Sequence, residues 1–161
     1  MPNFEMRRKD HQIEDVREID AILSRALVGR IGMSSHDNPY VVPVNFLYSH
    51  GAIYFHSANE GQMYTYLEAN NQICFEVDEL EETVTNTDPC EFSFKYESVI
   101  AFGKVRFLQD PGEKTAILTR LVEKYDKNKI ASKSVTAEKV GNVEVGEITI
   151  DHMTGKRSPV S

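Results

Sequence analysis

The stretch YFHSANEGQMY, residues 54–64, brings together residue types that bind phosphate groups. Its first residues alternate like a β-strand, which places His56 on the face opposite the core. Gly61 then precedes a helix expected over residues 62–70. The first amides of a helix have no intrahelical partner and carry partial positive charge, so an anion binds well there. The Ser57 hydroxyl and the His56 imidazole add hydrogen-bond donors at the same place.

A bound phosphate usually also contacts Lys or Arg, and this turn has no such neighbour in the sequence. No Lys or Arg occurs between Arg30 and Lys95. A cation must therefore come from a distant part of the fold. The candidates are Arg30, Lys104, Arg106, Lys156 and Arg157.

Both features also have ordinary explanations, and the pattern alone leaves them open. Ser57 or Asn59 could act only as the N-cap of the helix, with His56 as a surface residue. Lys156 and Arg157 could belong to a frayed, solvated terminus.

The sequence contains no motif for a metal site, a disulfide framework, a nucleophilic serine or a glycine-rich nucleotide-binding loop. The five histidines are scattered, and Cys74 and Cys90 lie outside any CxxC motif, so neither a metal site nor a disulfide framework is expected. Cys74 is expected to pack in the interior. The GxSxG, GxxxxGK[ST] and GxGxxG motifs are absent.

Length and charge restrict the function further. The 161 residues suit one domain over 1–161, with extended termini at 1–12 and 152–161. The net charge of -7 would repel a polyphosphate backbone, so nucleic acid is not expected as a partner. No apolar run approaches a membrane span, and the first residues lack the apolar core of a signal peptide. These observations predict a cytoplasmic protein that does not bind membranes.

Hydrophobic periodicity predicts two or three helices. One covers about residues 15–26 and another residues 62–70. A third opens at Asp110, a typical N-cap that is followed by Pro111. Its apolar stripe comprises Ile117, Leu118, Leu121, Val122 and Tyr125.

Five to seven short strands alternate with turns along the rest of the chain. They are expected at residues 27–34, 40–48, 52–57, 72–80, 91–108 and 143–150, with a bulge at Gly103. Pro43 cannot donate to a sheet and so marks an edge, a bulge or an opening. The acidic residues 79–89 are expected to form a connection and 151–161 a polar tail, while 126–142 are not assigned.

Strands and helices do not alternate regularly, which argues against a doubly wound parallel sheet. Antiparallel hairpins that must close their edges predict a small barrel with helices packed outside it. The expected fold class is therefore mainly β with α (α+β).

Several short motifs occur in an order that resembles the FMN-binding split-barrel family related to pyridoxamine 5′-phosphate oxidase. They are MRRKD, PYVVPVNF, YFHSANEG, ICFEVD, YESVIAFGKV and MTGKRS, and the resemblance runs from Met6 to about Ser158. Within the family it is most similar to the nitroimidazole-resistance (Nim-like) branch. The resemblance implies an antiparallel, Greek-key split β-barrel. It also implies a homodimer with one FMN in each of two clefts at the subunit interface.

The resemblance also assigns roles to residues of this chain. The FMN phosphate would be held by His56, Ser57 and the turn around Gly61. The isoalloxazine ring would be lined by residues 42–45 of the preceding expected strand. Relatives commonly carry Lys near the position of Gln62. The glutamine keeps a hydrogen-bond donor but lacks the positive charge of lysine. The cofactor-binding set that follows is Val42, Pro43, Val44, Asn45, His56, Ser57, Gly61, Gln62, Met63, Ser98, Val99, Lys156 and Arg157.

The function implied is an FMN-dependent oxidoreductase that reduces nitro-aromatic (5-nitroimidazole-like) or quinone-like small molecules with NAD(P)H. Hydride transfer to flavin requires no acid or base from the protein, so no side chain is expected to be essential for catalysis. His56 is the only candidate for a direct catalytic role. An alternative is a protein that binds flavin, or another planar ligand such as haem, without turnover. Pyridoxamine 5′-phosphate oxidation is less expected, because its second phosphate clamp would need Arg and Lys that residues 31–94 lack.

Overall fold

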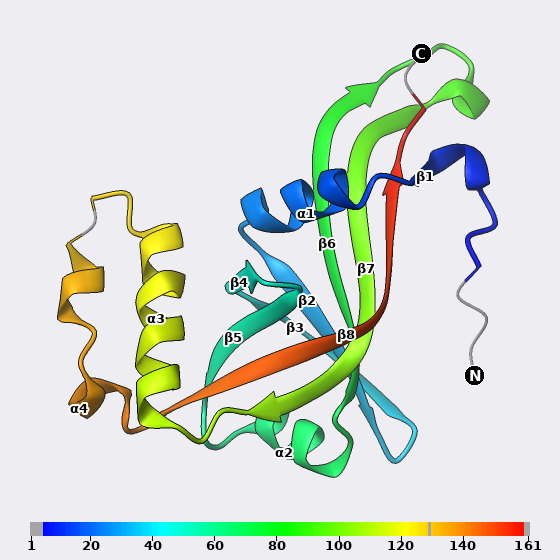
Figure 1. The fold of residues 1–161 in the computed structure, drawn as a ribbon. Helices are drawn as coiled ribbons and strands as arrows, with labels where there is room; N and C mark the ends of the chain where they lie inside the picture. The colour runs from blue at the N-terminus through cyan, green and yellow to red at the C-terminus, as the bar shows by residue number, and fades with distance from the viewer. Residues whose placement is uncertain (1–4, 129, 160–161) are drawn as a thin grey trace.

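The computed structural model describes residues 5–128 and 130–159. Their strands form one eight-stranded sheet in which every pairing is antiparallel. The order is β3-β2-β6-β7-β8-β5-β4, with β1 paired to β8 (Figure 1). The strands are β1 (Gln12–Ile13), β2 (Gly29–Ser35), β3 (Asn38–Val44), β4 (Phe46–Ser49), β5 (Ala52–Ala58), β6 (Gln72–Val84), β7 (Ser93–Phe107) and β8 (Val143–Arg157).

The two end strands of this order are neighbours in the chain. Only Asn45 separates β3 from β4, yet β3 pairs with β2 and β4 pairs with β5 at the other end of the sheet. One continuous segment therefore joins both edges, and the sheet curls into a barrel that is split at Asn45. Pro43 lies in β3, an end strand, as a residue without an N–H donor should. The expected α+β split barrel is confirmed.

The long strands β6, β7 and β8 differ from the sequence expectation in their extent. Residues 79–84, expected in an acidic connection, continue β6 and pair with β7. Basic side chains neutralise acids there, as in the ion pairs Arg25–Glu79 and Lys95–Glu82. The expected polar tail likewise continues β8 to Arg157 along β7. The bulge expected at Gly103 is confirmed by the shift in pairing between Phe102 and Gly103.

Helices lie around the barrel rather than between its strands (Figure 1). They are α1 (Val16–Arg25), α2 (Gln62–Ala69), α3 (Pro111–Tyr125) and α4 (Ala137–Val140), with short 3-10 turns at Lys9–His11, Pro89–Glu91 and Ala131–Ser134. The expected N-cap of α3 is confirmed, because the Asp110 side chain accepts a hydrogen bond from Glu113 N at 2.7 Å. No described helix is long and apolar enough to cross a membrane.

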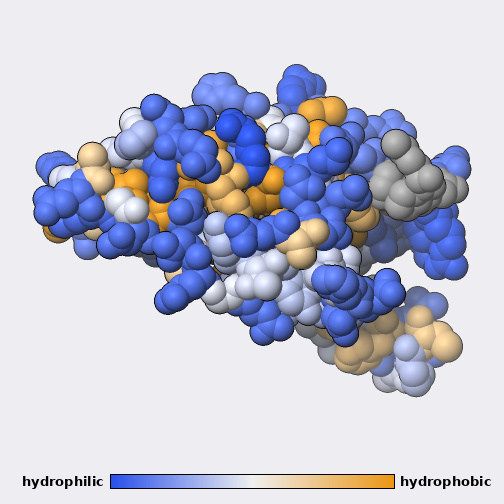
Figure 2. Space-filling view, turned by 90° about the horizontal axis from the view of Figure 1, so that it is seen from below, coloured by the Kyte–Doolittle hydropathy of each residue, from blue (hydrophilic) through white to orange (hydrophobic). Residues whose placement is uncertain are grey.

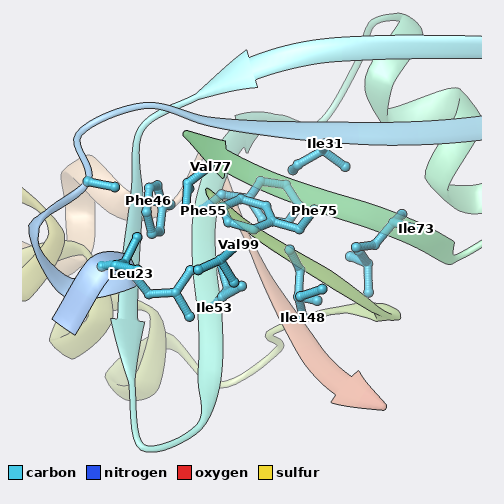
Figure 3. Packing of buried hydrophobic residues seen from close by; sticks show 14 of the residues in the cluster. Leu23, Ile31, Phe46, Ile53, Phe55, Ile73, Phe75, Val77, Val99 and Ile148 are labelled. Carbon is cyan, nitrogen blue, oxygen red and sulfur yellow. The ribbon is translucent and has the colours of Figure 1, made fainter. Parts of the chain in front are cut away.

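Apolar side chains from the inner faces of the strands fill the barrel (Figure 3). Phe46, Phe55 and Phe75 are fully buried, and the rings of Phe46 and Phe75 meet edge to face at 5.0 Å. A second cluster joins α3 to the outer face of the barrel, through residues that include Leu118, Leu121 and Val145. These two clusters hold β5 between the barrel interior and α3.

Candidate functional site

The turn between β5 and α2 leaves the start of α2 open. Gly61 is the N-cap residue, with φ of 103°, and no side chain caps this helix. The Ser57 hydroxyl donates instead to Ala58 O at 3.0 Å. The alternative that Ser57 or Asn59 serves only as the N-cap is therefore wrong. Gln62, the first residue of α2, is exposed, whereas Met63 packs against the core.

His56 lies on the outer face of β5, beside α3. Its partner across the β5–β8 ladder is Val145, which packs in the cluster under α3. Although the residue is exposed overall, partial burial lowers the pKa of the His56 imidazole. The ring is consequently neutral at pH 7 and can donate through one nitrogen and accept through the other.

An open groove of about 410 Å³ joins His56 to Asn45. Its other wall is apolar and comes mainly from α3, with Leu118, Leu121, Val122 and Tyr125. Figure 2 shows apolar surface on the side of the molecule that carries α3 and α4, bordered by hydrophilic residues. Asp126, just after α3, also lines the groove, so its lining is mainly apolar with the polar groups of Asn45, His56 and Asp126. A mainly apolar lining with a few polar groups suits a flat aromatic ring.

The α3 residues that line this groove were not among the site residues expected from the sequence. Their spacing identifies an amphipathic helix, and that pattern is explained equally well by core packing. Val122 and Tyr125 are only partly buried, so the helix stripe extends beyond the core into the groove. Nothing in the sequence pairs this stripe with His56, because β5 and α3 are more than fifty residues apart.

The expected ring-lining residues of β3 divide between two faces. Val42 and Val44 point inward and pack against the barrel core, and Pro43 is exposed on the other face. A ligand outside the barrel would therefore meet mainly the backbone of Val42 and Val44, whose side chains are partly buried. Asn45 is exposed at the split, between the last residue of β3 and the first of β4.

Ser98 and Lys156 lie side by side on the outer face of the long strands. They are direct partners across β7 and β8. The Lys156 ammonium lies 5.5 Å from the centre of the Tyr96 ring, a weak cation–π contact. Val99 points the opposite way and is fully buried in the core, so its side chain does not contribute to any surface site.

Arg157, in contrast, is already neutralised within the chain. Its guanidinium pairs with Glu97 at 2.6 Å and with Glu18 at 2.7 Å. Glu97 is 6% exposed and also pairs with Arg25. This network stabilises the end of β8 against β7 and α1, and it makes Lys156 rather than Arg157 the more available cation. It also shows that these residues do not belong to a frayed terminus.

The two groups of expected site residues are far apart in one chain. Val145, the partner of His56, and Lys156 are eleven positions apart on β8. A strand rises about 3.3 Å per residue, so eleven residues span roughly 36 Å when straight. This length is an upper limit, because β8 bends along its course (Figure 1), and no contact joins Lys156 to His56 among the described residues.

Lys114, which no sequence pattern singles out, lies nearer to the open turn. Ser57 pairs across the ladder with Glu144, and Lys114 Nζ lies 3.9 Å from Glu144 Oε2. Lys114 is thus paired with an acid, as are two of the expected candidates: Arg30 pairs with Glu76 at 3.0 Å and Arg106 pairs with Glu147.

The family model described as pyridoxamine 5′-phosphate oxidase matches residues 15–157, which is most of the chain. The chain belongs to this family. A candidate 5-nitroimidazole antibiotic resistance protein from Bacteroides thetaiotaomicron is 34% identical to it. That match covers 90% of this chain and 85% of that one, with a TM-score of 0.78.

Two further solved structures share the fold at lower identity. The flavocytochrome Anf3 from Azotobacter vinelandii has a TM-score of 0.85 at 21% identity, over 97% of this chain and 73% of that one. The FAD and heme binding protein from Mycobacterium smegmatis has a TM-score of 0.83 at 18% identity, over 93% and 74%. No curated protein matches the chain.

As a member of the pyridoxamine 5′-phosphate oxidase family, the chain can be tested for its fit to a flavin nucleotide. The uncapped start of α2 suits a phosphate, and the groove of about 410 Å³ lies within the range of small-ligand sites. A neutral imidazole and the Asn45 amide provide both donors and acceptors for ring edges. The residues therefore fit, with one deficit, which is positive charge beside the turn. Among the described residues, no three His, Cys, Asp or Glu side chains gather as metal ligands.

Proposed function

We propose that this chain is an FMN-binding oxidoreductase that acts as a homodimer. It reduces small planar electron acceptors of the nitro-aromatic (5-nitroimidazole-like) or quinone-like kind with NAD(P)H. The observation that carries the proposal is the groove that joins Asn45 and His56, with His56 on the strand that leads into an uncapped helix start, in a chain of this family. The similarity to the Bacteroides protein supports the choice of acceptor.

The proposal assigns roles to the chain's own residues. The first amides of α2, with Ser57 and Gln62, would hold the phosphate, and Lys114 would add positive charge from α3 by exchanging Glu144, 3.9 Å away, for the phosphate. Asn45 and His56 orient the ring by hydrogen bonds, while the α3 wall excludes water from one side. Bound FMN supplies the two-electron chemistry between a nicotinamide and the acceptor.

A second copy of the chain supplies what one copy lacks. Ser98 and Lys156 share the outer sheet face with two exposed apolar residues, Val41 (61% exposed) and Ile100 (38% exposed). Apolar side chains on an open sheet face are typical of protein interfaces. Pairing of this face between two copies brings Lys156 of one to the site of the other, which removes the separation of roughly 36 Å estimated for a single chain.

The decisive experiment is an anaerobic titration of protein reconstituted with FMN. We expect flavin absorbance at a stoichiometry of one FMN per chain, bleaching by NADH or NADPH, and recovery of the colour when a 5-nitroimidazole or a quinone is added. If the flavin is bleached but no acceptor restores its colour, the protein binds flavin without reducing these acceptors. Protein that binds no flavin contradicts the proposal altogether.

A planar-ligand carrier is the second candidate, and one observation favours it. Among the described residues, no hydrogen bond or ion pair engages His56, and its lowered pKa leaves a free imidazole lone pair facing an apolar groove. Such an imidazole is a good axial ligand for haem iron. Titration with haemin separates the two: a Soret band that shifts in wild type but not in His56→Ala supports haem binding, and unchanged spectra exclude it.

Oxidation of pyridoxamine 5′-phosphate is less well supported. It requires a second phosphate clamp beside the flavin, and the basic side chains Arg30, Arg106 and Arg157 are each engaged with carboxylates. We therefore expect no turnover of pyridoxamine 5′-phosphate under conditions in which a nitro compound is reduced.

A further inference from the structure

The split in the barrel leaves backbone polar groups that a strand would normally satisfy. Phe46 is the first residue of β4, an end strand whose only neighbour is β5. Its side chain is fully buried against the core. A buried N–H or C=O without a partner costs about as much as a lost hydrogen bond, so these groups need another source of partners.

Two consecutive side chains from the end of α3 meet this need. Phe46 N donates to the Tyr125 hydroxyl at 2.9 Å, and that hydroxyl lies 2.8 Å from Leu27 O and 3.2 Å from Phe46 O. A hydroxyl has one proton, so it donates to one of the two carbonyls at a time.

Lys124 binds the same segment from its other side. Its Nζ donates to Phe46 O at 3.0 Å and to Ala26 O, just after α1, at 2.7 Å. The ammonium also lies 3.9 Å from the centre of the Phe46 ring. Among the described residues, no ion pair joins Lys124 to a carboxylate, so the backbone carbonyls and the Phe46 ring are its main partners.

These contacts adjoin the ligand groove directly. Asn45, which lines the groove, immediately precedes Phe46, and the Tyr125 ring lines the groove opposite. Phe46 also pairs with Phe55 of β5, the residue before His56, so the position of the Phe46 backbone sets where Asn45 lies relative to His56.

We propose that Lys124 and Tyr125 form a latch across the split and act as positioning residues that set the width of the flavin groove. This inference deepens the proposed function and rests on it. The latch acts through the Phe46 backbone, and its function is distinct from the packing of α3, which depends on Leu118 and Leu121.

The test compares Tyr125→Phe and Lys124→Met with a matched control on the same helix. Arg120→Met also removes a polar contact between α3 and β4, because Arg120 donates to Ser49 Oγ at 2.9 Å, but at the end of β4 away from the split. Tyr125→Phe retains the ring that lines the groove and removes only the hydroxyl. Urea denaturation of all variants establishes that each is folded.

Two readouts are measured, one of which needs no ligand. In protein without FMN, we expect amide hydrogen exchange at Phe46 to accelerate about tenfold or more in Tyr125→Phe and to change less than twofold in Arg120→Met. With FMN, we expect both latch variants to bind about tenfold more weakly, with a shifted flavin absorbance band, and Arg120→Met to match wild type.

The outcomes separate the latch from the proposed function. Unchanged Phe46 exchange in Tyr125→Phe overturns the latch whatever the flavin result. Accelerated exchange with unaltered FMN affinity and spectrum shows a structural contact that does not position the groove, and this also overturns the inference. If wild type binds no FMN, the proposed function and the groove-setting role fail together, while the exchange data still decide whether the latch exists.

Discussion

Lys124 offers a quantitative test of the environment at the split. Burial lowers the pKa of its ammonium from 10.5 to about 8, whereas in the unfolded chain it titrates near its ordinary value. Between these two values the unfolded state binds more protons than the folded state. The free energy of unfolding therefore gains a contribution that rises as pH increases from about 8 to 10.5 and is absent below pH 8.

The magnitude follows from the same difference. The interval from about 8 to 10.5 corresponds to an upper limit of roughly 3.4 kcal/mol. Because Lys124 retains contact with solvent, screening reduces this, and we expect about 1–2 kcal/mol. In Lys124→Met the contribution disappears. The difference in unfolding free energy between wild type and Lys124→Met should therefore increase by this amount over the interval.

The assay is urea denaturation at several pH values from 7 to 10.5. Other groups near the split that titrate in this range, above all Tyr125 with its raised pKa, are present in both proteins and largely cancel in the difference. Arg120→Met serves as the control, because arginine remains charged throughout and its difference from wild type should stay flat. A difference for Lys124→Met that is equally flat, or that falls with pH, would refute the burial of a charged amine at this position.

Three further predictions address the site, the core and the C-terminal strand. Gln62→Lys should restore positive charge at the start of α2 and tighten FMN binding about tenfold in a fluorescence titration; unaltered affinity would argue against a phosphate at this turn. Gly146→Ala should destabilise the fold by roughly 1–3 kcal/mol in urea, because the new Cβ would lie 2.3 Å from the Phe55 ring, while Gly112→Ala, whose Cβ would lie 3.1 Å from the N-cap carboxylate of Asp110, should change stability by less than ~1 kcal/mol. Glu97→Gln should lower the free energy of unfolding by roughly 2–4 kcal/mol, since it leaves two arginines without their buried carboxylate; a thermal midpoint equal to wild type would contradict this.

Much of the fold could be predicted because its signals are local. The N-cap at Asp110 and the bulge at Gly103 are short-range features, and both occur where the sequence places them. The extent of the long strands could not be predicted in this way. Residues 79–84 look like an acidic loop until Arg25 and Lys95 neutralise them from other elements.

The candidate site was predicted less completely. The turn from His56 to Gly61 is contiguous, so its residue types alone indicated an anion-binding helix start. The α3 wall, the pairing of Arg157 with Glu97 and the proximity of Lys114 to Glu144 are contacts between distant segments. No local pattern distinguishes a lysine that approaches a ligand from one that faces water.

By itself, the sequence determined the alternation that makes β-strands, the stripe that makes α3, and an open turn rich in donors, because these depend on residues a few positions apart. The tertiary structure alone decided which face of each strand meets a helix and which cation is free. It also decided that the break at Asn45 is held by Lys124 and Tyr125. Such contacts depend on the curvature of the whole sheet, which brings together backbone and side chains that are about eighty residues apart in the chain.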